Sequence, residues 1–337
     1  MRIPLSKGRA RVTSMLTQNR TVKWTDRIGR RLKLNDLHIF LTVAELGSMG
    51  KAAEQLAISQ SSISKAMADL EHTVGVRLLD RTAKGVELTH YGRALLRRGI
   101  GAFDELRQGI EDMRFLDDPT VGEVRMGCPE AIASGLLARV LDLFSSRYPR
   151  AAIKVRPADN MTQEFRQLRE RKVDLLVGGI PGLFKEADLD AEVLFDDRPF
   201  IVSGTNSRWA SRRKIELGEL LEESWLLPGD SFLSSLLAEA FQSKGLAGPK
   251  YGVTSYSVYQ RIYLLNTGRF VAVQSGSVLH FARQHFAFKV LPVDLAFRSW
   301  PVAIVTLKNR TMSPLVQTLI DSVRDTARAL AKDKVWG

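Results

Sequence analysis

The chain has 337 residues, of which 45% are hydrophobic, so it is long enough for two or three domains with buried cores. No stretch approaches the ~20 apolar residues that cross a membrane, and the N-terminus lacks the apolar core of a secretion signal. We therefore expect a cytoplasmic protein without membrane association. The single cysteine, Cys128, cannot form an internal disulfide and is expected to be buried as a small hydrophobe.

The net charge of +12 is concentrated at the start of the chain. Residues 1–31 contain nine basic residues and one acidic residue, which gives 9 − 1 = +8. We expect this segment to be a disordered tail, with Met15 as an alternative start. The other interpretation is an arm that grips DNA phosphates without sequence preference. Nucleic-acid binding therefore has to be argued from a motif rather than from charge.

Two helices are predicted before residue 57. The segment LNDLHIFLTVAELGS has an apolar stripe at helical spacing, and Gly47 ends it in the way a left-handed residue ends a helix. The segment SMGKAAEQLAI is a shorter amphipathic helix, whose small inner residues allow two helices to cross closely. The residues expected on the inner faces are Leu34, Leu37, Phe40, Leu41 and Ala44 in the first helix and Ala52, Ala53 and Leu56 in the second.

A third helix follows after only Ala57 and Ile58, in the segment SQSSISKAMADLE. Ser59 is a good N-cap, because its hydroxyl can accept a hydrogen bond from a backbone N–H of the first turn. The apolar positions, at spacings of four and three, are Ile63, Met67 and Leu70. The helix start is otherwise polar, which fits a solvated turn or the recognition helix of a helix-turn-helix. In such a motif the polar start enters the major groove of DNA, and the three-helix context favours that interpretation.

The segment VRLLDRTAKGVELTH predicts two short strands around Ala83-Lys84-Gly85, which would form a wing. Its basic residues are placed to reach the DNA backbone or the minor groove, although solvated turn charges are the alternative. The residues predicted to contact double-stranded DNA are Ser59, Gln60, Ser61, Ser62, Ser64, Lys65, Arg81 and Lys84.

Residues 89–116 contain no proline and repeat apolar residues by sevens, as in a short coiled coil. Several glycines lower the helix propensity of this segment, so the helix needs a partner. The predicted seam consists of Leu96, Phe103, Leu106, Ile110 and Met113. Pro119 then marks a domain boundary.

From Gly122 onward strands and helices alternate, which predicts an α/β domain with mostly parallel sheets. Two sets of such elements, joined by crossing strands near RPFIVSG, predict two lobes, and TMSPLVQTLIDSVRDTARAL forms a last helix with Ser313 as its cap and Pro314 at its first position.

Ligands of open α/β sheets bind at the carboxyl ends of the strands, close to helix N-termini. This rule predicts a polar site for an anionic or polyhydroxylated molecule, although for any single residue a simple capping role is the alternative. The predicted ligand residues are Ala131, Ser134, Thr162 and Gly178 in the first lobe and Ser203, Ser231, Thr254 and Gln274 in the second.

The stretch AELGSMGKAAEQLAISQSSISKAMADLEHTVGVRLLDRTAKGVELTHYGRALL resembles the DNA-binding domain of LysR-type transcriptional regulators. It departs from the family at Ser61, where proline is usual, and at Met49, where an aromatic residue is usual. The two α/β lobes are similar to the effector-binding domain of this family, which itself resembles type 2 periplasmic binding proteins. The resemblance covers roughly residues 32–325.

The resemblance implies a winged helix-turn-helix at 32–90, a linker helix at 91–118 that pairs two subunits, an effector domain at 119–325 and a C-terminal tail at 326–337. It also implies a dimer of dimers that works with RNA polymerase and is controlled by a small molecule. Part of the late sequence resembles the branch that controls sugar uptake or aromatic-acid catabolism. A sugar, a sugar acid or an aromatic acid is then the expected effector.

The rival classes have little support in the sequence. No nucleophile elbow, zinc-protease motif or phosphate loop is present, so we expect neither an enzyme nor a metal or cofactor site. His280 and His285 are five residues apart on a predicted helix and are expected to be surface residues. A periplasmic solute-binding protein would need an export signal and would have no use for a helix-turn-helix.

Overall fold

The computed structural model describes residues 29–82, 85–158, 165–229, 231–283, 285–294 and 297–332. The basic residues 1–28 lie outside these ranges. The chain divides into two compact units, Met1–Ala102 and Phe103–Gly337.

The first unit is built on three helices, α2 (Leu34–Leu46), α3 (Met49–Leu56) and α4 (Gln60–Val74), which pack on one another after the short α1 (Gly29–Arg31). Gly47 ends α2 with φ of 62°, as predicted, and Ala57 forms the tight turn between α3 and α4 with φ of 53°. Leu37, Phe40 and Ile63 are buried as expected, but Leu34 is 53% exposed. Ile39 and Val43, which the predicted stripe omitted, are part of this core.

The wing is the antiparallel pair β1 (Leu79–Thr82) and β2 (Gly85–Leu88), with Leu79 opposite Leu88. Glu71 of α4 fixes its start, since one carboxylate oxygen accepts the N–H groups of Leu78 at 2.6 Å and Leu79 at 3.2 Å. The predicted turn residues Ala83 and Lys84 lie outside the described residues.

The helix α5 (His90–Asp117) follows, and the division between the two units falls within it. Its start packs closely on the wing. A Cβ at Gly92 would lie 2.1 Å from the carbonyl oxygen of Leu78, so the contact requires glycine at this position. The predicted linker helix is therefore present.

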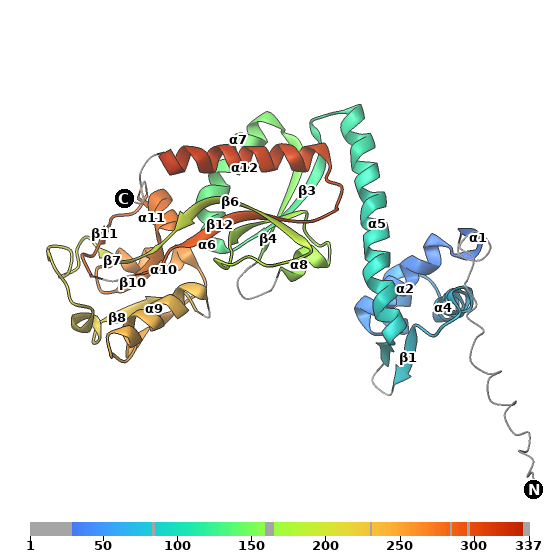
Figure 1. Ribbon diagram of the computed structural model, residues 1–337, viewed down its shortest axis with the longest axis horizontal. Helices are drawn as coiled ribbons and strands as arrows, with labels where there is room; N and C mark the ends of the chain where they lie inside the picture. Colours follow the sequence, from blue (N-terminus) through green and yellow to red (C-terminus); the bar gives the residue numbers. More distant parts are fainter. Residues whose placement is uncertain are drawn as a thin grey trace, which may run out of the picture. The chain divides into compact units, whose positions relative to one another are not determined.

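The second unit contains two five-stranded sheets (Figure 1). In the first sheet the order is β4-β3-β5-β12-β6, where β3 is parallel to β4 and β5, and β12 is antiparallel to β5 and β6. Its strands are β3 (Val121–Cys128), β4 (Arg150–Pro157), β5 (Leu175–Gly179), β6 (Leu189–Asp197) and β12 (Trp300–Leu307).

A broken helix follows β3 and consists of α6 (Glu130–Ile132), a π-helical turn (Ala133–Leu137) and α7 (Ala138–Arg147). The helix α12 (Pro314–Lys332) packs on α7, β3 and β6, whereas the short α8 (Arg166–Arg169) packs on β12 (Figure 1). Ser313 caps α12, since its hydroxyl accepts the N–H of Val316 at 3.4 Å. The helix extends past residue 325, where the sequence suggested a tail.

The second sheet has the order β11-β7-β10-β8-β9. Strand β7 is antiparallel to β10 and β11, whereas β8 is parallel to β10 and β9, so both sheets are mixed. The expectation of mostly parallel sheets is correct only for three adjacent strands of each sheet, β4-β3-β5 and β10-β8-β9. The strands are β7 (Pro199–Gly204), β8 (Ser224–Leu227), β9 (Tyr251–Thr254), β10 (Val271–Ser275) and β11 (Phe288–Val290). The helices are α9 (Phe232–Ser243), α10 (Val258–Leu265) and α11 (Gly276–Ala282), with a 3₁₀ turn at Leu217–Leu220. The chain passes between the two lobes from β6 to β7 and from β11 to β12.

Two further expectations concern burial. Cys128 is buried, as predicted, and burial raises the pKa of its thiol to about 12. His280 is also buried, so the prediction of a surface residue was wrong there, because α11 lies against the second sheet; His285 is exposed.

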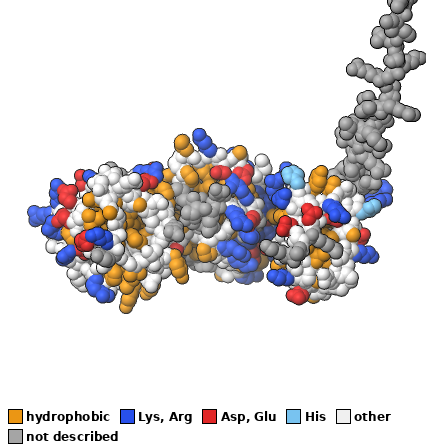
Figure 2. All heavy atoms as spheres, turned by 90° about the horizontal axis from the view of Figure 1, so that it is seen from below, with side chains coloured by type: hydrophobic (Ala, Val, Ile, Leu, Met, Phe, Trp, Pro, Cys, Tyr) orange, Lys and Arg blue, Asp and Glu red, His pale blue; other side chains and the backbone are white. Residues whose placement is uncertain are grey.

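On the face shown in Figure 2, lysine and arginine side chains are scattered among aspartate and glutamate side chains. Within the described part of the chain, no helix is long and apolar enough to cross a membrane.

Candidate functional site

The start of α4 carries a cluster of serine hydroxyls. Ser59 is the N-cap, and its hydroxyl accepts the N–H of Ser62 at 3.1 Å, as predicted. The hydroxyl oxygens of Ser61 and Ser62 each lie 2.8 Å from that of Ser59. Ser61, which replaces the usual proline, therefore adds a hydroxyl to the cap. The cluster fixes the orientation of the first turn and leaves its polar atoms at the surface.

The other predicted DNA contacts lie close to this cluster. Gln60 and Lys65 are exposed, while Ser64 is half-buried and its hydroxyl contacts the sulfur of Met49 at 3.8 Å. Arg81 lies in β1, and Lys84 is outside the described residues. The buried face of α4 anchors the helix, so its polar start is presented on a rigid support. An amide, hydroxyls and an ammonium group at a helix N-terminus can bind base edges and phosphates.

The C-terminal half of α5 exposes apolar side chains within the second unit. Leu106, Ile110 and Met113 are 48%, 47% and 63% exposed, and Leu116, which the predicted seam omitted, is 83% exposed. Phe103 is half-buried in the second unit, and Leu96 is half-buried in the first. The outer seam is thus an uncovered apolar stripe in the single chain.

A buried network of charges ties this part of α5 to the first sheet. Asp104 of α5 accepts hydrogen bonds from Arg310 at 2.7 and 2.9 Å and from Arg107 at 3.1 Å. Asp174, just before β5, accepts hydrogen bonds from Arg125 at 2.8 Å and from Arg310 at 2.6 Å. Burial raises the pKa of Asp104, but the hydrogen bonds and charges of the arginines outweigh it and hold this pKa at about 2. Burial also raises the pKa of Asp174, but the hydrogen bond and charge of Arg125 and the charge of Arg310 lower it overall, so both carboxylates are ionised at neutral pH.

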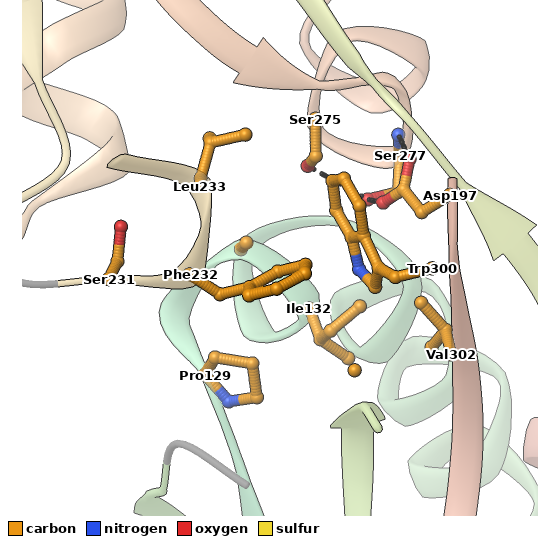
Figure 3. A pocket seen from close by; sticks show the side chains of 12 residues that line it. Pro129, Ile132, Asp197, Ser231, Phe232, Leu233, Ser275, Ser277, Trp300 and Val302 are labelled. Atoms are coloured by element: carbon orange, nitrogen blue, oxygen red, sulfur yellow. Dashed lines mark hydrogen bonds between the residues drawn. The ribbon is translucent and has the colours of Figure 1, made fainter. Parts of the chain in front are cut away.

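A pocket opens between the two lobes of the second unit (Figure 3). Its cavity volume is about 120 Å³, within about 590 Å³ of empty space that includes open solvent. The first lobe and β12 contribute Pro129, Ala131, Ile132, Gly179, Trp300 and Val302. The second lobe contributes Ser231, Phe232, Leu233, Ser275 and Ser277, and Asp197 lies at the crossing between the lobes.

The polar side of the pocket is organised by Asp197. Its carboxylate accepts the hydroxyl of Ser277 at 2.5 Å and the backbone N–H groups of Ser277 at 3.1 Å and Arg198 at 2.9 Å. The hydroxyls of Ser275 and Ser277 lie 3.1 Å apart. Burial raises the pKa of the Asp197 carboxyl, although these hydrogen bonds oppose the change. The carboxyl therefore supports the start of α11 from another strand.

The apolar side is formed by two aromatic rings. The ring centroids of Phe232 and Trp300 lie 5.6 Å apart at an interplanar angle of 82°, and Figure 3 shows both rings beside Ile132 and Pro129. Phe232 is the first residue of α9, and Trp300 is the first residue of β12. The two lobes thus meet at this ring pair.

The structure brings together only some of the predicted ligand residues. Ala131 and Ser231 line the pocket, and Gly178 is adjacent to Gly179, which lines it. Thr162 lies outside the described residues. The predicted residues that do not line this pocket are Ser134, whose hydroxyl bonds the Glu130 carbonyl; Ser203 and Gln274, which are buried in β7 and β10; and Thr254, which is exposed at the end of β9.

The sequence did not point to Asp197, Ser275 or Ser277 as pocket residues. The strand-end rule selected Gln274 instead, although Ser275 and Ser277 follow it by only one and three positions.

Both units match families of known proteins. Residues 34–93 match the bacterial regulatory helix-turn-helix proteins of the lysR family, and residues 117–328 match the LysR substrate binding domain. The chain belongs to the LysR family. This result confirms the resemblance seen in the sequence motifs.

Curated relatives span nearly the whole LysR-type chain. The regulator GbpR of Azospirillum brasilense is 25% identical over 87% of this chain and 86% of its own. TdcA of Escherichia coli K12 is 25% identical over 87% and 93% of the two chains, and PcaQ of Agrobacterium fabrum is 23% identical over 92% and 100%. All three are named as HTH-type transcriptional regulators.

Solved structures share the fold of this LysR-family protein. A cysteine-to-aspartate variant of full-length OxyR from Pseudomonas aeruginosa has a TM-score of 0.60 at 22% identity, covering 88% of this chain and 95% of its own. Full-length CbnR, in complex with its target DNA, has a TM-score of 0.58 at 20% identity, covering 88% and 100%. The protein is a DNA-binding transcriptional regulator with an effector-binding domain, and the family consists of regulators rather than enzymes.

Proposed function

We propose that this regulator binds an inverted-repeat operator as a dimer of dimers in the cytoplasm and, with RNA polymerase, activates an operon for transport or catabolism when a small molecule occupies the interlobe pocket. The observation that carries the proposal is the exposed polar start of α4, held by the Ser59 cap on a buried apolar face. The resemblance to the branch for sugar uptake or aromatic-acid catabolism supports the choice of operon.

Each predicted contact has a distinct role in this proposal. Gln60 pairs bidentately with an adenine, and the hydroxyls of Ser59, Ser61, Ser62 and Ser64 reach base edges or phosphates. Lys65, Arg81 and Lys84 neutralise phosphates, so they contribute affinity rather than sequence preference. CbnR, which shares the fold, has been solved with its target DNA, and this supports the same use of the helix here.

The apolar stripe on α5 supports the oligomer. Leu106, Ile110 and Met113 repeat at coiled-coil spacing and are exposed in the single chain, so a second α5 is the simplest cover for them. Two recognition helices in such a dimer would read half-sites whose centres are about 34 Å apart, or a multiple of that distance.

A selection experiment tests the proposal. The full chain is incubated with a pool of random duplex DNA, and the retained sequences are read after several rounds. We expect enrichment of an inverted repeat. A pool that stays random, with binding that depends only on salt, would show that the protein has no sequence-specific operator activity.

A further inference from the structure

The chemistry of the interlobe pocket limits the kind of effector that it can take. This inference rests on the proposed function, because it assumes that the effector binds in that pocket. Among the described residues that line the pocket, none is lysine, arginine or histidine, and one, Asp197, is an acid.

An anionic ligand would meet an unfavourable environment here. Asp197 is buried, and it already accepts the hydroxyl and the N–H of Ser277 at the start of α11. At this helix start the N–H and hydroxyl of Ser277 are therefore taken by Asp197, and the N–H of Gly276 is taken by the carbonyl oxygen of Arg198 at 2.9 Å. A second anion nearby would be desolvated and repelled without a paired cation, which is costly at low dielectric.

One arginine lies close to an aromatic ring of the pocket. The guanidinium carbon of Arg298 lies 5.7 Å from the centroid of the Phe232 ring. However, its side chain is 64% exposed and pairs with Glu239 at 3.4 Å. Arg298 is not among the pocket residues and remains in solvent, so it does not supply the missing countercharge.

The remaining walls favour a ligand with two unlike ends. Phe232 and Trp300 present ring surfaces, with Ile132 and Val302 beside them, and this side suits a planar apolar body. The opposite side offers oxygen atoms from Ser275, Ser277 and Asp197, which can accept hydrogen bonds from a donor. These oxygen atoms can accept a hydrogen bond from a neutral hydroxyl as well as from an ammonium group.

We propose that the pocket binds a small molecule with an aromatic or similarly planar apolar body and a hydroxyl or amine donor, and that it rejects carboxylates and phosphates. Among the effectors expected from the sequence, this excludes the sugar acids and the aromatic acids. The donor is directed at Asp197 and the two serines, while the body lies against Phe232 and Trp300.

Three probes with the same phenyl ring and two-carbon spacer test this proposal: 2-phenylethanol, phenethylamine and 3-phenylpropanoate. Their affinities for the full chain are measured by isothermal titration. We expect the alcohol or the amine to bind at least about tenfold more tightly than the propanoate. The Trp300→Ala variant should lose this binding, which assigns it to the pocket.

A variant that removes the negative charge of the pocket gives a sharper test, because it should change the relative affinities of the amine and the propanoate. Asp197→Asn should weaken phenethylamine by about tenfold or more and improve 3-phenylpropanoate. Asp142→Asn, at an exposed position of α7, is the matched control and should change the affinity for neither the amine nor the propanoate. If Asp197→Asn does not fold, Ser275→Ala replaces it and should weaken 2-phenylethanol while leaving the propanoate unchanged.

The proposal is overturned if the propanoate binds as tightly as the other two probes and loses its binding in Trp300→Ala. It is equally overturned if none of the three binds at millimolar concentration. A band-shift assay with operator DNA distinguishes a failure of the proposed ligand class from a failure of the proposed regulation. A bound alcohol or amine that leaves the DNA complex unchanged would contradict the proposed regulation but not the ligand class.

Discussion

Asp104→Asn should destabilise the second unit strongly. Moving the pKa of Asp104 from its ordinary value of 3.8 to about 2 corresponds to about 2 kcal/mol of stability at neutral pH. The variant also leaves the fully buried side chain of Arg310 with only Asp174 and the carbonyl of Val173. Removing one partner of a buried charge pair costs about 3 to 5 kcal/mol, so we expect a loss between these two estimates.

Urea unfolding followed by tryptophan fluorescence is the assay, since Trp209, Trp225 and Trp300 all lie in this unit. The folded pKa is lower than the unfolded one. The contribution of Asp104 is therefore complete above about pH 4 and is lost as the pH falls toward 2. Wild type and variant should then differ at pH 7 and converge in acid. Asp142→Asn, an exposed control, should stay within about 0.5 kcal/mol of wild type. Equal urea midpoints for Asp104→Asn and wild type at pH 7 would refute the reasoning.

Two further predictions concern α5. Ile110→Asp should shift sedimentation toward smaller species, because it places a charge in the exposed seam. Leu183→Asp, at an exposed apolar site elsewhere, should not shift it. An unchanged oligomer in Ile110→Asp would show that the seam is not part of the interface. Gly92→Ala should lower the melting temperature of the first unit, because its Cβ would lie 2.1 Å from the carbonyl oxygen of Leu78. Gly109→Ala, where nothing lies within 4 Å, should be neutral or stabilise the helix by up to about 1 kcal/mol, and equal effects of both variants would contradict the packing argument.

The local features of the fold could be predicted because each depends on a few neighbouring residues. The Ser59 cap, the left-handed Gly47 and the Ser313 cap before Pro314 are signals of this kind. The apolar face of α4 follows in the same way from helical spacing. The motif of the first unit was therefore visible in the sequence.

The pocket could be predicted only in outline, because it depends on which strand-end side chains turn toward the space between the lobes. Ser203 and Gln274 were selected by the strand-end rule, but both are buried in adjacent strands of the second sheet. Asp197 lies 80 positions from Ser277, and the spacing of residues along the chain does not show that they meet. The same reason hid the pairing of Asp104 with Arg310, which are 206 positions apart.

The central claim is that the start of α4 reads a DNA sequence, and the Gln60→Ala variant tests it most directly. Binding to the selected operator and to versions with single base-pair changes is measured at one fixed salt concentration, with Gln242→Ala on α9 as the matched control. We predict that Gln60→Ala loses about 1 to 3 kcal/mol of discrimination at one or two base pairs while its non-specific affinity stays the same, and that the control behaves as wild type. A Gln60→Ala protein that protects the same site with the same base preferences would contradict the claim.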